Sequence, residues 1–451
     1  MKNLARLAFA AALALTCVLP SEAKISDLLP RPKNIQAKNG SPFVLGREVA
    51  LNDPTNNKML KAFLAETGCT ESNVAVADAD AATAVIEVAI VDTIDKAFNH
   101  NVPLFPDEAY AIDVTENRIA IKALTPLGVT RAAQTLCQLA EGYDGTPAIE
   151  ALSMTDWPAF KVRGFMHDVG RSFLPVEELK TEIDRLARFK VNVFHWHLTE
   201  KLAWRFEVKA YPQLTADANM TRYPGQYYTQ DDCREIEAYA AERGMTVIPE
   251  IDMPGHSDVF TKAMGFSMQT DQGVEALKNI LDEVVEVFPN APYIHIGGDE
   301  VTITYTDFLK IMANYVRGKG KKVVMWNRLV AGPPSAEQCD MTQMWATAGK
   351  VVKGLPNIDC RYNYTNHFDV YADVVGIYRS NIYYTQQGTA DVAGTISAAW
   401  NDTKTPTETD IVRQNNIYAN ILASAERAWY GGGQQYIEAG GHHPAQLGGG
   451  V

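Results

Sequence analysis

The chain has 451 residues, 46% of them hydrophobic, and this length predicts two or three globular domains with sizeable cores. Because 54 acidic residues outnumber 41 basic ones, the formal net charge is −13 at pH 7. This acidic balance argues against nucleic acid or an anionic membrane surface as the main partner.

The first 23 residues have the pattern of a secretory signal peptide. Basic residues precede an apolar stretch at residues 7–19, and a small-residue cleavage pattern follows at residues 21–23. We therefore expect an exported protein, periplasmic or extracellular, that starts at Lys24. A membrane anchor is less favoured, because the apolar stretch is shorter than the roughly 20 residues that span a bilayer, and no later segment would span one either. Lipid attachment at Cys17 stays open.

Cleavage would leave five cysteines: Cys69, Cys137, Cys233, Cys339 and Cys360. At least one is then unpaired within a monomer, although export permits disulfides. Because none of them shows CxxC spacing, we expect most to be buried free thiols.

Residues 24–150 predict a small α+β domain. Strand patterns occur at residues 84–91 and 110–123, and helical patterns at residues 58–66 and 127–142. In the second helix, apolar residues recur at the three-and-four spacing of a buried face. The domain shows no group of residues typical of a catalytic or metal site. The turn at residues 155–158 is typical of a domain boundary.

Residues 151–440 predict a parallel (β/α)8 barrel, or TIM barrel, in which strands alternate with helices. The strand patterns lie at residues 163–169, 191–198, 246–251, 293–296, 322–326, 342–345, 358–362 and 395–400. Helical patterns are clearest at residues 177–189, 230–243, 274–288 and 307–317. A glycine-rich tail occupies residues 441–451 and leaves a truncated C-terminus open. Such a barrel carries its active site at the carboxyl ends of its strands.

The expected strand ends carry polar and aromatic side chains that predict one shared pocket. In chain order they are Asp168, Arg171, His197, Glu200, Glu250, Asp252, His256, Asp299, Glu300, Trp326, Trp345, Tyr364, Trp400 and Asp402. Four of them are aromatic and would form walls that stack against a sugar ring. The alternative for each aromatic residue, taken alone, is ordinary barrel packing.

Asp299 and Glu300 follow an apolar strand and the flexible pair Gly297 and Gly298. Two adjacent carboxylates cannot both ionise freely, so we expect one proton to be held at a raised pKa, as a general acid requires near neutral pH. The alternative is that both residues belong to the first turn of a helix, where acidic residues are favoured.

A metal site is the rival enzyme hypothesis. His195 and His197 point to the same side of a strand and, with His256 and Asp299, resemble the ligands of an amidohydrolase. Satisfied histidines inside a barrel are the commoner outcome, so we expect no metal.

Several motifs resemble those of the β-N-acetylhexosaminidases of glycoside hydrolase family 20, over nearly the whole mature sequence. They are NVFHWHLT at residues 192–199, PEIDMPGH at 249–256, HIGGDE at 295–300, WND at 400–402 and AER at 425–427. The resemblance implies removal of terminal β-linked N-acetylglucosamine or N-acetylgalactosamine from glycans with retained configuration. In this family the substrate's 2-acetamido group attacks in place of an enzyme carboxylate. No cofactor is therefore expected.

The resemblance also implies roles for the strand-end residues. Glu300 would donate a proton and later activate water, while Asp299 would orient the acetamido group and stabilise the oxazolinium intermediate. The implied substrate-binding residues are Arg171, His256, Trp326, Trp345, Tyr364, Trp400 and Asp402, and the implied supporting residues are Asp168, His197, Glu200 and Asp252. Asp252 could orient His256, and a purely structural role is about as well supported.

Three positions depart from the family pattern. Glu200 and Asn366 stand where Asp is usual, and Asp402 stands where Glu is common. These departures leave open the preference between the two sugars, the linkage and any substituted sugar. They also keep alive a second hypothesis, a module that binds sugar without cleaving it. The sequence does not specify the oligomeric state.

Overall fold

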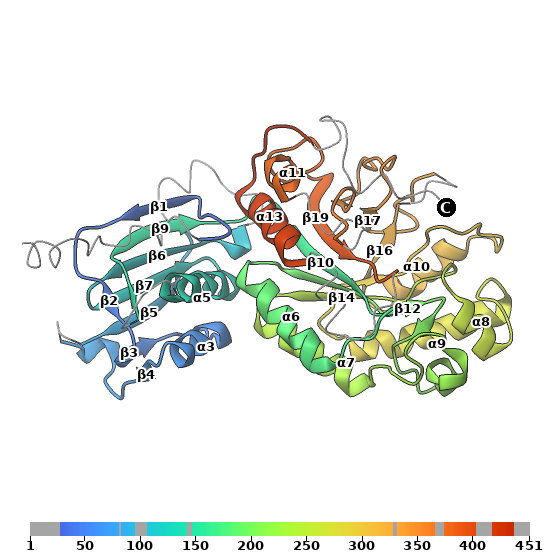
Figure 1. Cartoon of the computed structure of the whole chain (residues 1–451), viewed down its shortest axis with the longest axis horizontal. Helices are drawn as coiled ribbons and strands as arrows, with labels where there is room; N and C mark the ends of the chain where they lie inside the picture. The colour runs from blue at the N-terminus through green and yellow to red at the C-terminus, as the bar shows by residue number, and fades with distance from the viewer. Residues whose placement is uncertain are drawn as a thin grey trace, which may run out of the picture.

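The computed structural model describes residues 28–80, 83–94, 106–141, 147–327, 332–365, 374–402 and 417–436. The expected signal peptide, Cys17, Asn366 and the glycine-rich tail lie outside these ranges. The described chain forms a small α+β domain beside a larger barrel, which confirms the expected fold class (Figure 1).

The small domain is a seven-stranded sheet with two helices on one face (Figure 1). Its strands, in spatial order, are β1 (Asn34–Ala37), β9 (Leu152–Asp156), β6 (Tyr110–Thr115), β7 (Arg118–Ala123), β5 (Val85–Ile90), β3 (Glu48–Asn52) and β4 (Thr70–Glu71). A separate pair joins β2 (Phe43–Val44) to β8 (Ala148–Ile149), and the helices are α3 (Lys58–Glu66) and α5 (Pro126–Glu141). Phe63 and Leu136 from the helices share one apolar core with Ile112 and Ile121 from the sheet.

The small domain differs from the expectation at two places. The strand pattern at residues 110–123 is a hairpin, in which β6 and β7 run antiparallel and Thr115 lies opposite Arg118. The period-two alternation continues on both sides of the turn, so the pattern alone does not reveal it. In addition, β9 pairs with β1 and β6, and the small domain therefore extends to Asp156, beyond residue 150.

The larger domain is a closed barrel of eight parallel strands. In chain order they are β10 (Val162–Asp168), β11 (Val193–His197), β14 (Thr246–Glu250), β15 (Tyr293–His295), β16 (Lys322–Trp326), β17 (Met341–Met344), β18 (Asn357–Asp359) and β19 (Val392–Ala399). All eight expected strands are confirmed, with small shifts at their ends. Closure brings Gly394 of β19 against Val162 of β10, where a β-carbon would lie 1.9 Å from the Val162 carbonyl oxygen. Only glycine permits this approach.

Helices surround the barrel. They are α6 (Val176–Arg188), α7 (Gln230–Glu242), α8 (Asp258–Met264), α9 (Asp271–Val287), α10 (Phe308–Gly318), α11 (Val374–Arg379) and α13 (Ile417–Tyr430). The four expected helices are confirmed as α6, α7, α9 and α10. Helix α6 has acidic residues in its first turn and basic residues in its last, which suits the helix dipole, and it buries Leu179, Ile183 and Leu186 against the barrel.

The regular alternation of eight strands and eight helices is wrong in one part of the barrel. The described residues between β16 and β17, and those between β17 and β18, contain no helix. The first of these connections includes Gly332, Pro333 and Pro334, a run that disfavours helix formation. A short hairpin, β12 (Thr199–Glu200) and β13 (Ala203–Trp204), follows β11.

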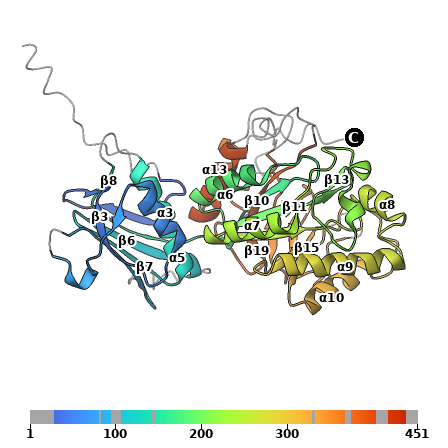
Figure 2. The same cartoon turned by 90° about the horizontal axis from the view of Figure 1, so that it is seen from below.

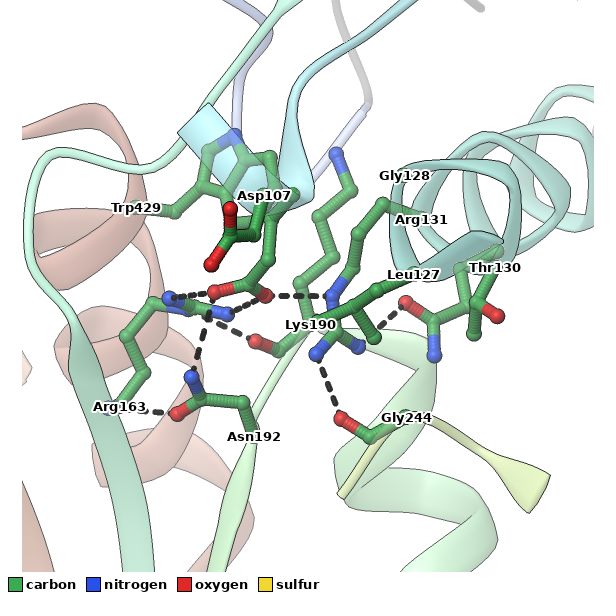
Figure 3. Close-up of polar contacts among 12 residues, drawn as sticks. Asp107, Leu127, Gly128, Thr130, Arg131, Arg163, Lys190, Asn192, Gly244 and Trp429 are labelled. Carbon is green, nitrogen blue, oxygen red and sulfur yellow. Dashed lines mark hydrogen bonds and ion pairs between the residues drawn. The ribbon is translucent and has the colours of Figure 1, made fainter. Parts of the chain in front are cut away.

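A buried polar network joins the two domains, where α5 packs beside α6 (Figure 2). Glu108 accepts hydrogen bonds from Arg131 of α5 (Nε to Oε2, 2.7 Å) and from Arg163 of β10 (Nη1 to Oε1, 3.0 Å) (Figure 3). Arg131 also donates to the carbonyl oxygen of Gly244 (2.6 Å), and Asn192 donates to Glu108 (3.3 Å). Arg163, Asn192 and Gly244 lie at the amino ends of barrel strands. The small domain is therefore held at the end of the barrel opposite the strand ends that carry the predicted site.

The cysteines and the helix lengths agree with the sequence analysis. The five cysteines of the described residues are all buried and form no disulfide, as expected. Within the described residues, no helix is both long and apolar enough to cross a bilayer.

Candidate functional site

A pocket opens at the carboxyl ends of the barrel strands. It is lined by Arg171, His197, Glu200, Asp252, His256, Asp299, Glu300, Trp345, Tyr364, Trp400 and Asp402. All eleven belong to the predicted set, so the strand-end expectation is confirmed for them. The other three predicted residues do not line the pocket: Asp168 contacts Arg171 (2.7 Å), the Trp326 ring packs near Trp400, with ring centroids 5.6 Å apart, and Glu250 is buried at the end of β14.

The loop after β15 places the two adjacent carboxylates. Gly297 has a φ of +65°, and a β-carbon there would lie 1.7 Å from Oδ1 of Asp252. Glycine is therefore required for the backbone to turn so close to that side chain. Asp299 and Glu300 lie in this loop and not in a helix, since the next helix, α10, begins at Phe308. The helix-turn alternative for this pair is wrong.

The environments of Asp299 and Glu300 differ. Burial raises the pKa of Asp299 to about 6, whereas a hydrogen bond from His256 lowers the pKa of the half-exposed Glu300. The proton with a raised pKa is thus held at Asp299 and not at Glu300, the residue expected to act as the acid. Burial, and then the charge of Asp299, also raises the pKa of Asp252. Oδ1 of Asp252 and Oδ1 of Asp299 have no hydrogen-bond partner among the described residues.

His256 connects Glu300 to a second carboxylate. Its Nδ1 lies 2.6 Å from Oε1 of Glu200, and its Nε2 lies 3.3 Å from Oε2 of Glu300. Burial opposes the charged imidazolium, but these two carboxylates raise the pKa of His256 to about 12. His256 is therefore a cation at neutral pH. Glu200, and not Asp252, is the carboxylate that orients it.

Arg171 lies at the other side of the pocket among three carboxylates. Its guanidinium contacts Asp168 (2.7 Å), Glu200 (2.6 Å) and Asp402 (3.5 Å). It also lies 5.3 Å from the ring centroid of Trp400. This juxtaposition of Arg171 and Asp402 matches the pair expected to hold sugar hydroxyls, and it also ties Arg171 to the Glu200–His256 contact.

Of two further residues that support the site, Asn401 lies outside the predicted set and Glu250 was predicted at a strand end without a role. Asn401 donates its side-chain amide to the carbonyl oxygen of Asp168 (2.6 Å), and its backbone N–H donates to the Asp168 carboxylate (3.2 Å). Glu250 ends β14 and lies buried beneath the pocket. The sequence indicates its strand-end position but no role for it, because its signal is no stronger than that of any polar residue of a barrel strand.

The four residues of the metal hypothesis do not form one group. In the described part of the chain, the possible ligand sets with atoms within 4.8 Å of one another are His195, Glu250 and His295, and separately Asp252, His256 and Asp299. Nε2 of His195 lies 2.8 Å from Glu250, and His256 is paired with two carboxylates as described above. The donor atoms of His195 and His256 are thus engaged by protein partners.

Two family models match the chain in succession. "Glycosyl hydrolase family 20, domain 2" matches residues 26–157, and "Glycosyl hydrolase family 20, catalytic domain" matches residues 160–272. The first match covers the small domain, and the second covers the barrel strands β10, β11 and β14. The chain belongs to glycosyl hydrolase family 20.

Similar sequences come from several bacteria. The chain is 33% identical over 290 residues to a beta-hexosaminidase of Vibrio furnissii, a match that covers 53% of this chain and 47% of the relative. It is 34% identical over 268 residues to a beta-N-acetylhexosaminidase of Cellulomonas fimi, a match that covers 53% of each protein. The chain thus spans about half the length of these two relatives.

Solved structures share the two-domain arrangement. The beta-N-acetylhexosaminidase of Bacteroides fragilis superposes with a TM-score of 0.75 at 29% identity, covering 91% of this chain and 92% of that one. An exo beta-N-acetylglucosaminidase of Vibrio harveyi, solved in complex with N-acetylglucosamine, shares the fold with a TM-score of 0.73 at 24% identity. That match covers 92% of this chain and 75% of the other.

Proposed function

We propose that this protein is a retaining exo-β-N-acetylhexosaminidase that removes terminal N-acetylglucosamine or N-acetylgalactosamine by substrate-assisted catalysis. The observation that carries the proposal is the arrangement of Asp299 and Glu300 on a single loop beside an aromatic wall. Two side chains that are neighbours in the chain are poorly placed to flank a glycosidic bond from opposite faces, as a protein nucleophile and an acid must. The family and the names of its relatives support the same activity.

The other carboxylates of the pocket are poor candidates for a nucleophile. Glu200 and, behind the lining, Asp168 are buried and held by Arg171, and Glu200 also contacts His256. Asp252 is buried, and burial together with the charge of Asp299 raises its pKa, which favours the protonated form that is not a nucleophile. Asp402 is half-exposed and lies 3.5 Å from Arg171. A carboxylate that is paired with a cation loses nucleophilicity. This distribution supports attack by the oxygen of the substrate's own acetamido group.

The mechanism assigns one role to each carboxylate of the pair. Glu300 protonates the leaving oxygen while the acetamido oxygen bonds to the anomeric carbon, which gives a bicyclic oxazolinium ion. Asp299 orients the acetamido N–H and stabilises the positive charge of that ion. Glu300 then takes a proton from water, which attacks from the face that the leaving group occupied. That proton restores the acid form of Glu300 for the next turnover, while His256, 3.3 Å away, remains a cation.

A pair of chromogenic substrates tests this function. We expect the wild-type protein to release nitrophenol from nitrophenyl N-acetyl-β-glucosaminide, and we expect no comparable release from nitrophenyl β-glucoside, because the glucoside lacks the attacking amide. Steady-state kcat/KM values for both substrates provide the measurement. The N-acetylgalactosaminide, measured alongside, reports the preference that Asp402 leaves open. Equal hydrolysis of the two glucose-derived substrates would reject the mechanism.

The pKa of Asp299 predicts a pH dependence. The mechanism needs this carboxylate charged, and in the free protein burial raises its pKa to about 6. As the pH falls through about 6, Asp299 gains a proton, and kcat/KM should fall about tenfold for each further pH unit. A kcat/KM profile between pH 4 and pH 8 measures this limb, and activity regained on return to pH 7 excludes unfolding as its cause. A profile that stays flat down to pH 4 would contradict the assignment.

We also infer that the protein acts outside the cytoplasm. The supporting pattern is the basic, apolar and small-residue order of residues 1–23. The mass of the protein recovered from the periplasm or medium should correspond to a chain that starts at Lys24. Recovery of the full-length chain from the cytoplasm alone would contradict export.

A further inference from the structure

Glu250 is a fully buried carboxylate at the centre of the barrel, directly beneath the pocket. Three histidine nitrogens surround it: Nε2 of His195 at 2.8 Å, Nδ1 of His197 at 2.5 Å and Nδ1 of His295 at 3.1 Å. The indole Nε1–H of Trp326 donates a fourth contact to Oε1 (2.8 Å). A buried carboxylate is destabilising unless it is paired, and these four contacts provide that pairing.

Glu250 is connected to the pocket through Trp326, by one hydrogen bond and one ring contact. This series of contacts is the first arm. Trp326 is completely buried, and its indole position is fixed by the hydrogen bond to Glu250. The ring of Trp326 packs against Trp400, with ring centroids 5.6 Å apart and the planes tilted by 43°. Trp400 lines the pocket, whereas Trp326 does not. The position of Trp400 in the pocket wall therefore depends on Trp326, whose own position depends on Glu250.

A second arm runs from Glu250 through His197 to the same wall. The rings of His197 and Trp400 meet edge to face, at 75° and 5.0 Å between centroids. Burial opposes a charge on His197, but Glu250 raises its pKa to about 9, so the ring is an imidazolium at neutral pH. A cationic ring against an indole is favourable by electrostatic attraction as well as by packing. Both arms thus converge on Trp400.

We propose that Glu250 is a positioning residue that fixes Trp400, and with it the wall of the pocket that contacts the substrate's acyl group. The inference rests on the proposed function, because it assigns the wall to binding of a 2-acetamido sugar. The two directional contacts of Glu250 fix the position and plane of Trp326 and His197, and these are the two rings that pack against Trp400. Glu250 would therefore determine how strictly the pocket selects an acetyl group over a larger acyl group.

The test replaces Glu250 with glutamine, which keeps the shape and removes the charge. We expect the indole N–H signals of both Trp326 and Trp400 to shift in a 15N-tryptophan spectrum assigned with single Trp→Phe variants. We also expect the kcat/KM preference for N-acetyl over N-propionyl glucosaminide to fall by about 10-fold or more, the scale typical of lost supporting contacts. The spectrum needs no turnover. A wild-type protein without hexosaminidase activity would reject the proposed function and leave the indole result to decide the positioning claim.

A matched control comes from a second buried carboxylate of the same barrel. Glu182 of α6 lies 2.9 Å from Nδ1 of His167, and both side chains are buried, but neither lines the pocket. Glu182→Gln should leave both indole signals and the acyl preference unchanged. Equal changes in the two variants, or an unchanged spectrum and acyl preference in Glu250→Gln, would overturn the proposal.

A second variant keeps the test decisive if Glu250→Gln fails to fold. His197→Gln removes one arm only, so we expect the Trp400 signal to shift and the Trp326 signal to stay near its wild-type position. If the Trp400 signal of folded His197→Gln protein does not shift, His197 does not help to fix Trp400, and the proposal is rejected.

Discussion

Replacing Glu300 by glutamine is expected to lower kcat for nitrophenyl N-acetylglucosaminide by about 10²- to 10⁴-fold, the range that a general acid–base group contributes. Glutamine keeps the size of the side chain and its contact with His256, but it cannot supply a proton to the leaving oxygen. The loss should be measured as kcat and kcat/KM with the circular dichroism spectrum unchanged. Near-normal turnover by the folded variant would reject the role of Glu300.

The leaving group provides an internal control for this variant. A dinitrophenyl leaving group departs with little need for protonation, so the first step of Glu300→Gln should recover on that substrate. The second step still lacks its base, and we therefore expect a burst of dinitrophenol followed by a slow steady state. Loss of equal size on both substrates, without a burst, would indicate that Glu300 acts by another route.

Replacing Glu108 by glutamine is expected to lower the free energy of unfolding by about 3–5 kcal/mol, because it breaks a buried ion pair by removing one partner. Glu108 is paired with Arg131 of the small domain and with Arg163 of the barrel, both labelled in Figure 3. All three side chains are buried. The variant would leave two buried cations next to each other without a counter-charge. Urea titration followed by tryptophan fluorescence measures the change.

A surface pair supplies the control for Glu108→Gln. Glu337 lies 2.7 Å from Lys310, but its side chain is 70% exposed, so Glu337→Gln should change stability by no more than about 0.5 kcal/mol. Burial opposes the charge on Glu108, yet Arg163 and Arg131 lower its pKa. The stability that Glu108 contributes is therefore fully present above the ordinary pKa of a glutamate. It is lost as the pH falls through the lowered pKa of Glu108 in the folded protein. If Glu108→Gln lowers the free energy of unfolding at neutral pH by no more than Glu337→Gln does, Glu108 does not hold the two domains together.

The barrel strands could be predicted because each is an apolar run with a periodic helix or a turn beside it. Once the strands are in order, topology alone brings their carboxyl ends together, and this is why eleven predicted residues line one pocket. The hairpin at Glu116 and Asn117 was missed because the alternation passes through it without a break. The described residues on either side of β17 contain no helix, and neither the length of these connections nor their turn residues predicts how they cross the barrel surface.

Contacts between distant parts of the chain could not be predicted. Glu250 looks like any polar strand residue, and its significance arises only when β11, β15 and β16 bring three histidine nitrogens and an indole N–H around it. Glu108 and Arg163 are separated by 55 residues and belong to different domains. The pKa difference between Asp299 and Glu300 depends on burial and on His256, neither of which adjacency in the sequence determines.

In the proposed mechanism the substrate's amide, and not a side chain, attacks the anomeric carbon. The most direct measurement is kcat/KM for nitrophenyl glucosaminides whose N-acetyl group carries zero, one, two or three fluorine atoms. Fluorine withdraws electrons from the amide oxygen while changing its size only slightly. We predict a steep decline along the series, and a rate that is independent of fluorination would contradict participation of the amide.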